Sequence, residues 1–482
     1  MDHLGLDLGT TTISAAVLDA DGRLLCTRTV PGGAAVAGQP WERKQDARGI
    51  EHAALSLLDG LLQEFPDIGC VGLTGQMHGI VYVDAAGQLL SPLYTWQDET
   101  GAQPGPDGKS TAARLTARTG YPLASGYGLV TLACHQAAGA IPDGAAAVCT
   151  IADYLAMRLS GRSTPRLTPS MAASLGLFDG TDFDRKAVRR AGLPEQLLPE
   201  VSEEAELGGG RLRVFAALGD NQASFLGAGQ GRLDAPLVNI GTGSQFSSFT
   251  KERRTVPGLE TRPFPGGWLL TGAPLCGGRS FALLERFFRQ TAELVTGTPC
   301  PSAYPAMLRA LEAPMPDDVP QFRTTFAGTR QDPAERAVLS GLDEENFAPV
   351  PLLHALLRGM ADELSACYRA ALKAGCAPAG RLLGSGNGLR RNPALQRAVE
   401  VLPQKEYVEQ TSTQATDHTL LNVEQIVQFA DEADLNDVKE TLQRQIDCNT
   451  AIAKQGLEGH WGAEIGRILL RSYGDSVHNR AK

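Results

Sequence analysis

A short hairpin rich in glycine and threonine occurs twice in this chain. The first copy begins at Leu4 (LGLDLGTTTISAAVLDADGRLL) and the second begins at Leu237 (LVNIGTGSQFSSFTKER). Glycine lets a turn approach an anion closely, and the peptide N–H groups and threonine hydroxyls of such a turn can hold phosphate oxygens. Because each copy opens one half of the chain, we expect two lobes that hold one polyphosphate between them.

Length and composition limit the class of protein. A chain of 482 residues is too long for one core and should divide into two or three domains. Its formal net charge of −10 gives no general attraction to nucleic acid or to an anionic membrane, so a polyanion must be bound locally by loops and metal. The apolar stretches are shorter than the ~20 residues that span a bilayer, and the N-terminus lacks the basic flank and apolar core of a signal peptide, so we expect a cytoplasmic protein. The nine cysteines form no CxxC pair, which favours reduced thiols over a zinc site.

The order of predicted elements is similar in the two halves. Hairpins come first and alternating helices and strands follow, which predicts two α/β lobes with a seam near residues 228–233. In the first half we expect a hairpin over 4–30, a helix over 50–65, a strand over 68–74, a second hairpin turning at 85–87 and mainly helices over 112–198. In the second half we expect strands over 236–250 and near 268, helices over 281–294 and 352–374, and a strand at 381.

Polar side chains follow the predicted strands. Gln76 and His78 in TGQMHG come directly after the strand IGCVGL, and ligands of α/β sheets are contacted at the carboxyl ends of strands. Both side chains could bind sugar hydroxyls while Met77 covers an apolar face, although Met77 and His78 could equally close a core. Trp96 and Asp98 in TWQDET suit a carbohydrate, or an interface tryptophan beside a solvated turn.

Asp220 lies at the end of a strand and before an apolar helix, in LGDNQASFLGAG. One interpretation is a helix N-cap, for which aspartate is favoured. The other is a base that accepts the proton of a substrate hydroxyl as it attacks a terminal phosphoryl group, a role typically worth about 10²–10⁴ in rate. A final glycine loop, LLGSGNGLRRNP from Leu382, is weak evidence alone because ordinary strand–helix turns show the same pattern.

Taken together and in order, these motifs resemble the FGGY carbohydrate kinases. They are DLGTTT, TGQMHG, TWQDET, GYGLVTL, DYLAMRLSG, GDNQASFLGAG, NIGTGSQ and GSGNGLRRNP. The resemblance covers about residues 3–402 and is closest to sedoheptulokinase-like members, with xylulokinases next. It implies a two-lobe actin-like (ribonuclease H-like) α/β ATPase fold, with an N-terminal lobe at 1–230 and an incomplete C-terminal lobe at 231–402. It also implies ATP and Mg²⁺ as cofactors and a ketose as acceptor, with sedoheptulose first and xylulose second.

The resemblance also implies roles for individual residues. Asp220 matches the catalytic base, and Asp7 matches a carboxylate near magnesium, which both would hold through water. The phosphate and adenosine loops match Gly9, Thr10, Thr11, Thr12, Gly241, Thr242, Gly243, Gly384, Ser385, Gly386 and Asn387. The sugar-side positions match Gln76, Met77, His78, Trp96, Asp98 and Asn221. The implied partners are a small sugar and ATP, with no nucleic acid and no membrane, and the chain would be a monomer or a homodimer.

Residues 403–482 differ in character from the rest. All 29 prolines lie at or before Pro403, and the segment carries 8 basic against 13 acidic residues in what we expect to be three polar-faced helices. An FGGY kinase would instead continue with a strand and a helix rich in glutamate, alanine and glycine. The segment IDCNTAIAKQGLEGHWGAEIG is similar to an internal stretch of the L-cysteine desulfidase or serine-dehydratase-alpha-like family, but the lone Cys448 cannot hold an iron–sulfur cluster.

Two origins of this segment stay open, a splice of unrelated reading frames and a selected fusion. The truncated second lobe leaves an alternative to the sugar kinase, namely a catalytically impaired actin-like protein that binds ATP or sugar. A desulfidase-type lyase is a further alternative that we do not expect.

Overall fold

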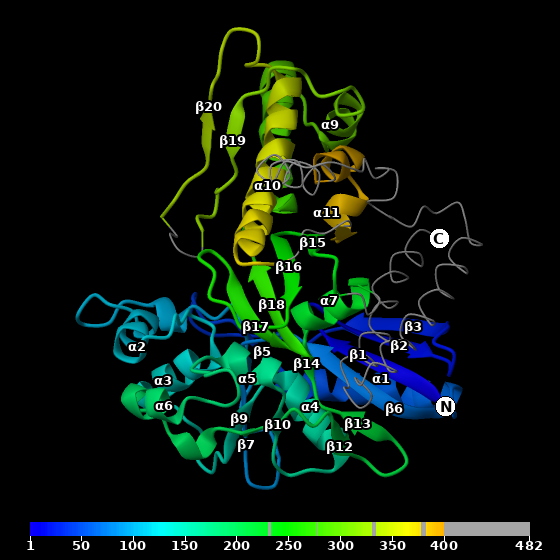
Figure 1. Cartoon of the computed structure of the whole chain (residues 1–482), viewed down its shortest axis with the longest axis vertical. Helices are drawn as coiled ribbons and strands as arrows, with labels where there is room; N and C mark the ends of the chain where they lie inside the picture. The colour runs from blue at the N-terminus through cyan, green and yellow to red at the C-terminus, as the bar shows by residue number, and fades with distance from the viewer. Residues whose placement is uncertain (230–232, 276, 330–333, 377–381, 400–482) are drawn as a thin grey trace, which may run out of the picture. The chain divides into compact units, whose positions relative to one another are not determined.

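The computed structural model describes residues 1–229, 233–275, 277–329, 334–376 and 382–399 (Figure 1). The described residues form two compact units. The first contains residues 1–229 and 263–266, and the second contains 233–262 and the described residues from 267 to 399. Each unit has its own hydrophobic core, so each is described separately. The helices predicted for residues 403–482 lie outside the described residues.

The first unit is built on a mixed sheet with the order β12-β13-β6-β1-β2-β3, with β14 also paired to β6. The strands are β1 (Asp2–Leu8), β2 (Thr12–Leu18), β3 (Leu24–Pro31), β6 (Ile68–Gly75), β12 (Glu206–Gly208), β13 (Arg213–Phe215) and β14 (Leu218–Gly219). The first three are antiparallel, which confirms the predicted hairpin, whereas β6 runs parallel to β1, and both β13 and β14 run parallel to β6.

The register of this sheet brings three strand ends together. Asp7 of β1 pairs with Thr74 of β6, and Leu218 of β14 pairs with the same Thr74. Because these strands are parallel, their carboxyl ends meet at one edge of the sheet. The residues that follow, including Gln76 and Asp220, therefore lie at the same edge as Asp7.

Helix α1 (Ala47–Glu64) begins where the side chain of Asp46 accepts a hydrogen bond from the amide of Arg48. Its buried residues recur every three or four positions, so one face packs against β2 and β3. The other helices of this unit are α2 (Thr111–Thr119), α3 (Gly128–Ala138), α4 (Ile151–Ser160), α5 (Pro169–Leu175), α6 (Arg185–Ala191), α7 (Asp220–Gly229) and the 3₁₀ turns η1 (Thr100–Ala102) and η2 (Glu195–Leu197).

Short strands complete the first unit. They are β4 (Ala35–Val36), β5 (Lys44–Gln45), β7 (Val81–Val83), β8 (Leu93–Tyr94), β9 (Ala147–Cys149), β10 (Arg166–Leu167) and β11 (Glu200–Val201). The predicted second hairpin turns where the amide of Gly87 donates to the carbonyl of Asp84.

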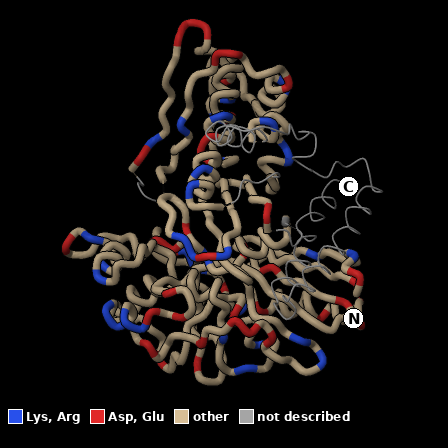
Figure 2. The backbone as a smooth tube through the Cα atoms, in the orientation of Figure 1, with Lys and Arg blue, Asp and Glu red and all other residues tan. Residues whose placement is uncertain are grey.

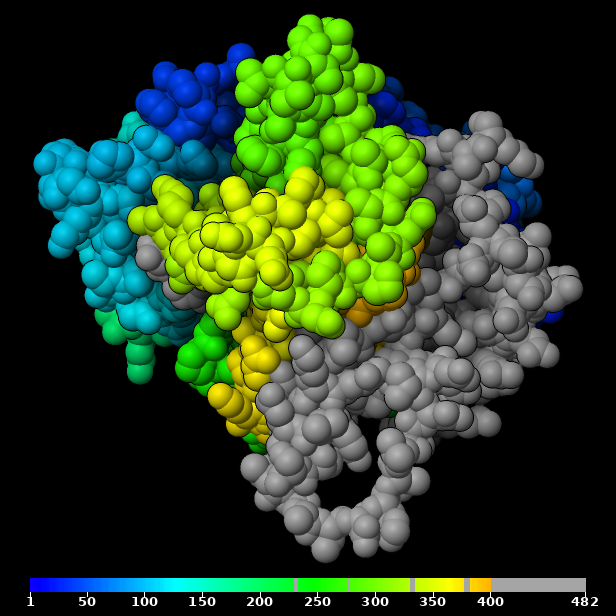
Figure 3. Space-filling view, turned by 90° about the horizontal axis from the view of Figure 1, so that it is seen from above, coloured from blue at the N-terminus to red at the C-terminus, as the bar shows by residue number. Residues whose placement is uncertain are grey.

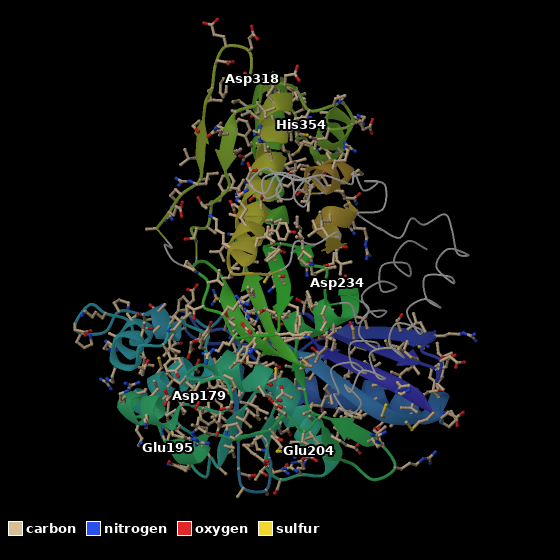
Figure 4. The ribbon with its side chains drawn as sticks, viewed as in Figure 1. Asp179, Glu195, Glu204, Asp234, Asp318 and His354 are labelled. Atoms are coloured by element: carbon tan, nitrogen blue, oxygen red, sulfur yellow. The ribbon has the colours of Figure 1, made fainter. Side chains whose placement is uncertain are left out.

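An ion pair with a buried arginine also lies in the first unit. Arg166 is 8% exposed and makes an ion pair of 2.8 Å with Glu204 (Figure 4).

The second unit contains a sheet with the order β17-β18-β16-β15-β21. Its strands are β15 (Leu237–Ile240), β16 (Ser244–Thr250), β17 (Glu260–Phe264), β18 (Gly267–Gly272) and β21 (Leu383–Ser385). As in the first unit, a run of antiparallel strands is followed by a strand parallel to the first, here β21 beside β15. Within the described ranges β21 is the last strand at its edge, whereas β6 of the first unit carries further parallel strands.

Two long helices cover the core of the second unit, α8 (Gly278–Thr296) and α10 (Pro349–Lys373), and both were predicted. The remaining elements are α9 (Tyr304–Ala310), β19 (Gln321–Arg323), β20 (Val338–Ser340) and α11 (Asn387–Arg390), followed by helical residues 393–399. Asp318, between α9 and β19, accepts a hydrogen bond of 3.0 Å from the side-chain Nδ2 of Asn346 (Figure 4). Figure 3 shows the green and yellow side chains of this unit packed closely together.

Three further features of the described residues are the distribution of their charges, the state of their cysteines and the hydropathy of their helices. Acidic and basic residues are interspersed along the loops of both units (Figure 2). No disulfide joins two cysteines within the described ranges. Among the helices that the structure describes, none is long and apolar enough to cross a bilayer.

Candidate functional site

Two carboxylates mark the edge of the first sheet where β1 and β14 end. Asp7 has a buried Oδ1 without a hydrogen-bond partner among the described residues. Burial, and then repulsion from Asp220, raise the pKa of Asp7 to about 7. Asp220 is exposed and is the first residue of α7, and its Oδ1 accepts the amide of Asn221 at 2.7 Å.

The geometry of Asp220 bears on its two interpretations. An N-cap side chain accepts the amide two or three residues further on, and the side chain of Asp220 accepts the amide of the next residue, Asn221. An exposed carboxylate beside a second, buried carboxylate fits a site for a cation, because opposite charge relieves the repulsion between them. Oxygen ligands suit Mg²⁺, which uses one or two protein carboxylates together with waters and phosphates. The unpartnered Oδ1 of Asp7 fits this arrangement, and the described residues contain no group of three or more metal ligands.

The first glycine–threonine turn, Gly9 to Thr12, follows Asp7 directly. A Cβ on Gly9 would lie 3.0 Å from the carbonyl oxygen of Thr12, so the turn is tight. Neighbouring segments hold Thr10 at two points: Gln45 Nε2 donates to its carbonyl at 2.7 Å and Trp96 Nε1 donates to its hydroxyl at 3.1 Å. The loop predicted to bind phosphate is thus attached to the loop predicted to bind sugar.

Gln76, Met77 and His78 follow β6 at the same edge. Gln76 is 3% exposed, and its Oε1 is buried without a partner in the described part of the chain. Met77 is 5% exposed and belongs to the hydrophobic core, as the core-closing interpretation predicts for that residue.

His78 has a backbone φ of 72°, a conformation that is uncommon for a residue other than glycine and is often found at functional sites. Its Nδ1 lies 2.7 Å from the carbonyl of Ser174, and its ring stacks on Tyr127 with centroids 4.7 Å apart. These contacts fix the ring.

The remaining sugar-side candidates differ in exposure. Trp96 is 45% exposed, whereas Asp98 is 2% exposed. The carboxylate of Asp98 accepts the backbone amides of Arg43 at 2.9 Å and Thr100 at 3.0 Å, so it supports the loop that carries Trp96. Asn221, beside Asp220 on α7, is 4% exposed.

In the second unit the Gly241–Gly243 turn packs against the start of α8. The amides of Gly278 and Arg279 donate to the carbonyls of Gly241 and Thr242 at 2.8 and 3.0 Å. A Cβ on Gly277 would lie 2.3 Å from the carbonyl of Gly243. These amides of α8 are therefore used by the turn, while Thr242 and Gly243 are exposed.

The adenosine-loop candidates run from β21 into α11. Gly384 and Ser385 pair with Val238 and Asn239, and Gly386 precedes Asn387 at the start of the helix. Gly386 has φ 92°, and a Cβ there would lie 2.5 Å from the carbonyl of Ile240. Packing inside the unit therefore explains this glycine without a ligand.

Sequence reasoning missed three residues that shape the first-unit site. Tyr127 and Ser174 hold His78, and Gln45 joins Thr10 to Gln76 through hydrogen bonds. Tyr127 belongs to the GYGLVTL motif, which contributes to the family resemblance but does not indicate a function for the tyrosine. Nothing in the segment around Gln45 distinguished it from a loop.

Residues 3–230 match the profile described as "FGGY family of carbohydrate kinases, N-terminal domain". Residues 3–230 belong to this family. The match extends beyond this domain, because the sedoheptulokinase of Mus musculus is 28% identical over 457 residues, covering 82% of this chain and 92% of that protein. The xylulose kinase of Streptomyces rubiginosus is 26% identical, covering 55% of this chain and 58% of that protein.

A solved structure shares the fold of this chain. The xylulose kinase of Rhodospirillum rubrum superposes with a TM-score of 0.71 at 20% identity, covering 95% of this chain and 100% of that chain. The predicted actin-like α/β fold class is thereby confirmed. The family also confirms the predicted enzyme class, a phosphotransferase with a sugar acceptor, and implies ATP as the co-substrate.

A short separate fragment has different relatives. A UPF0597 protein of Desulfitobacterium hafniense is 52% identical over 67 residues, which is 14% of this chain and 16% of that protein. A second one, from Lachnoclostridium phytofermentans, is 41% identical over 78 residues. The chain therefore combines sequence of two origins, as predicted from the change in character at Pro403.

Proposed function

We propose that this protein transfers the γ-phosphoryl group of ATP to a hydroxyl of a ketose, with sedoheptulose the first candidate and xylulose the second. The observation that carries the proposal is the carboxylate pair of Asp7 and Asp220 at the ends of β1 and β14. The relatives named above support a ketose. The sedoheptulokinase covers more of this chain than the xylulose kinase of Streptomyces rubiginosus does, which is why sedoheptulose comes first.

In the proposed reaction Asp220 accepts the proton of the sugar hydroxyl as the hydroxyl oxygen attacks the γ-phosphorus. The bond from that phosphorus to the bridging oxygen of ADP then breaks. Phosphoryl transfer depends mainly on positioning and charge neutralisation, and a base placed at the end of a strand meets the first of these needs. When bound beside Asp7 and Asp220, Mg²⁺ would neutralise charge on the phosphate oxygens.

The other candidate residues bind and orient in this proposal. Gln76, His78, Trp96, Asp98 and Asn221 surround the acceptor, either through direct contact or by holding the loop. Thr10, Thr11 and Thr12 contact phosphate from the first turn. Gly241 to Gly243 do so from the second, and Gly384 to Asn387 lie beside the adenosine.

The test compares Asp220→Asn with the parent chain on a panel of ketoses, with ADP release as the readout. We expect kcat to fall by about 10²–10⁴ while ketose binding, measured by calorimetry, changes little, because the amide keeps the shape but cannot take a proton. Asp234→Asn, at an exposed aspartate of the second unit, is the matched control (Figure 4). Equal turnover by Asp220→Asn and the parent would remove Asp220 from the role of base.

The fragment of foreign origin favours a second candidate. If residues from 403 onward replace part of the nucleotide lobe, the chain binds ketose and releases no ADP. Calorimetry with ketose and with an ATP analogue distinguishes this impaired protein from an active kinase.

A further inference from the structure

Gln45 lies on a short strand paired on both sides, although the surrounding sequence is polar. It is on β5, which pairs with β4 on one side and with β8 on the other. The next residue, Asp46, caps α1. Both neighbours hold the backbone of Gln45, so its side chain starts from a fixed point.

The hydrogen bonds of Gln45 determine which way its amide faces. Nε2 donates to the carbonyl of Thr10 at 2.7 Å and lies 3.4 Å from the carbonyl of Gly33. Carbonyl oxygens only accept hydrogen bonds, so the NH₂ group of Gln45 must face them and its Oε1 must face away. That Oε1 accepts a bond of 3.1 Å from Nε2 of Gln76.

The orientation of the Gln76 side-chain amide follows in the same way. Because Oε1 of Gln45 can only accept, the NH₂ group of Gln76 is turned toward it. The Oε1 of Gln76 then points the other way, where it is buried and has no partner among the described residues. A buried acceptor without a partner is uncommon, and a donating hydroxyl of a ligand would satisfy it.

We propose that Gln45 is a positioning residue that sets the orientation of the Gln76 amide, so that the site offers the sugar an acceptor oxygen and selects a hydroxyl that donates. The proposal rests on the ketose kinase function proposed above. The backbone carbonyl of Thr10, in the phosphate loop, fixes the side-chain amide of Gln45. The amide of Gln45 in turn fixes the side-chain amide of Gln76 on the acceptor side. Gln45 itself touches neither reacting group.

The test is a double-mutant cycle of Gln45→Met and Gln76→Met, read by ketose binding in calorimetry without nucleotide. Each single variant should weaken binding about 5–10-fold, the range of one hydrogen bond. The double variant should bind no worse than Gln76→Met alone, because Gln45 acts through Gln76. Losses that multiply in the double variant would overturn the proposal.

A conservative variant separates orientation from packing. In Gln45→Glu the protonated carboxyl group keeps the acceptor that faces Gln76 and can still donate to the carbonyl of Thr10, so ketose affinity measured at acidic pH should stay within about 3-fold of the parent. A loss as large as that of Gln45→Met would contradict the proposal. Gln88→Met, at an exposed glutamine of the hairpin turn, is the control for the substitution itself.

A failure of the proposed function can be told apart from a failure of this inference. If the parent chain binds no ketose, the kinase proposal fails. The pairing of the Gln45 and Gln76 amides is then tested by urea unfolding of the same single and double variants. Non-additive midpoints for Gln45→Met and Gln76→Met are expected from their shared hydrogen bond. Additive midpoints would show that the two amides do not act together.

Discussion

Asp153 is a buried carboxyl group whose protonation should make the stability of the first unit depend on pH. It is 1% exposed at the start of α4, where its Oδ2 accepts the hydroxyl of Thr150 at 2.7 Å. Its Oδ1 is buried without a partner in the described part of the chain. Burial raises the pKa of Asp153 to about 8, and the bonds from Thr150 oppose this only in part.

The sign and size of the effect follow from proton linkage. In the unfolded chain an aspartate has a pKa of about 3.9, so the folded state holds more protons between about pH 4 and pH 8. Stability is therefore lost as the pH rises through this window. Between pH 5 and pH 8 the loss attributable to Asp153 is about 3–4 kcal/mol, at about 1.4 kcal/mol per unit. The substitution Asp153→Asn removes this loss, because an amide has no proton to release and can still accept the hydroxyl of Thr150.

The assay is urea unfolding at pH 5 and pH 8, with hydrogen exchange of the α4 amides to report the first unit separately. We expect the advantage of Asp153→Asn over the parent to grow by about 3–4 kcal/mol between these two pH values. Asp143→Asn, at an exposed aspartate of the same unit, should leave the pH dependence unchanged. Parallel pH profiles for the parent and Asp153→Asn would refute the reasoning.

Two further predictions concern the loops. Because the pKa of Asp7 is raised to about 7, its carboxylate becomes available as the pH rises through 7, and the Mg²⁺ concentration needed for half-maximal ADP release should be lower at pH 8 than at pH 6; no such difference would count against a cation beside Asp7. Gly386→Ala should destabilise the second unit by about 1–3 kcal/mol in urea unfolding, because the new Cβ would meet the carbonyl of Ile240 at φ 92°. Gly258→Ala has a similar φ of 84° and open space, so a cost equal to that of Gly386→Ala would show that the contact contributes nothing.

The helices and strands predicted best were those whose apolar pattern lies within a single segment of sequence. The hairpin over 4–30 appears as β1 to β3, and the predicted helix over 50–65 appears as α1, which begins a few residues earlier because Asp46 caps it. Alternating or recurring apolar residues report which face is buried, and that information lies within one segment of sequence.

The contacts that build the site were not predictable, because they join segments far apart in the chain. Asp98 accepts the amide of Arg43, 55 residues away, so it supports the Trp96 loop, a contact that the sequence alone does not reveal. Strand β5 has two residues and no hydrophobic period, so only its pairing with β4 and β8 reveals it. Gln45 gains its role from that pairing.

The division of the proposed site between the units bears on the change of sequence after Pro403. Every acceptor-side candidate and both carboxylates, Asp7 and Asp220, lie in the first unit. In that unit β6 is followed in the sheet by β13 and β14, whereas β21 of the second unit is the last strand at its edge within the described ranges. We expect residues 403–482 to be the segment of second origin, and they follow β21 in the chain, so their effect should fall on the loops of the second unit that are proposed to hold ATP. The acceptor side is held by hydrogen bonds that the described residues of the first unit make among themselves.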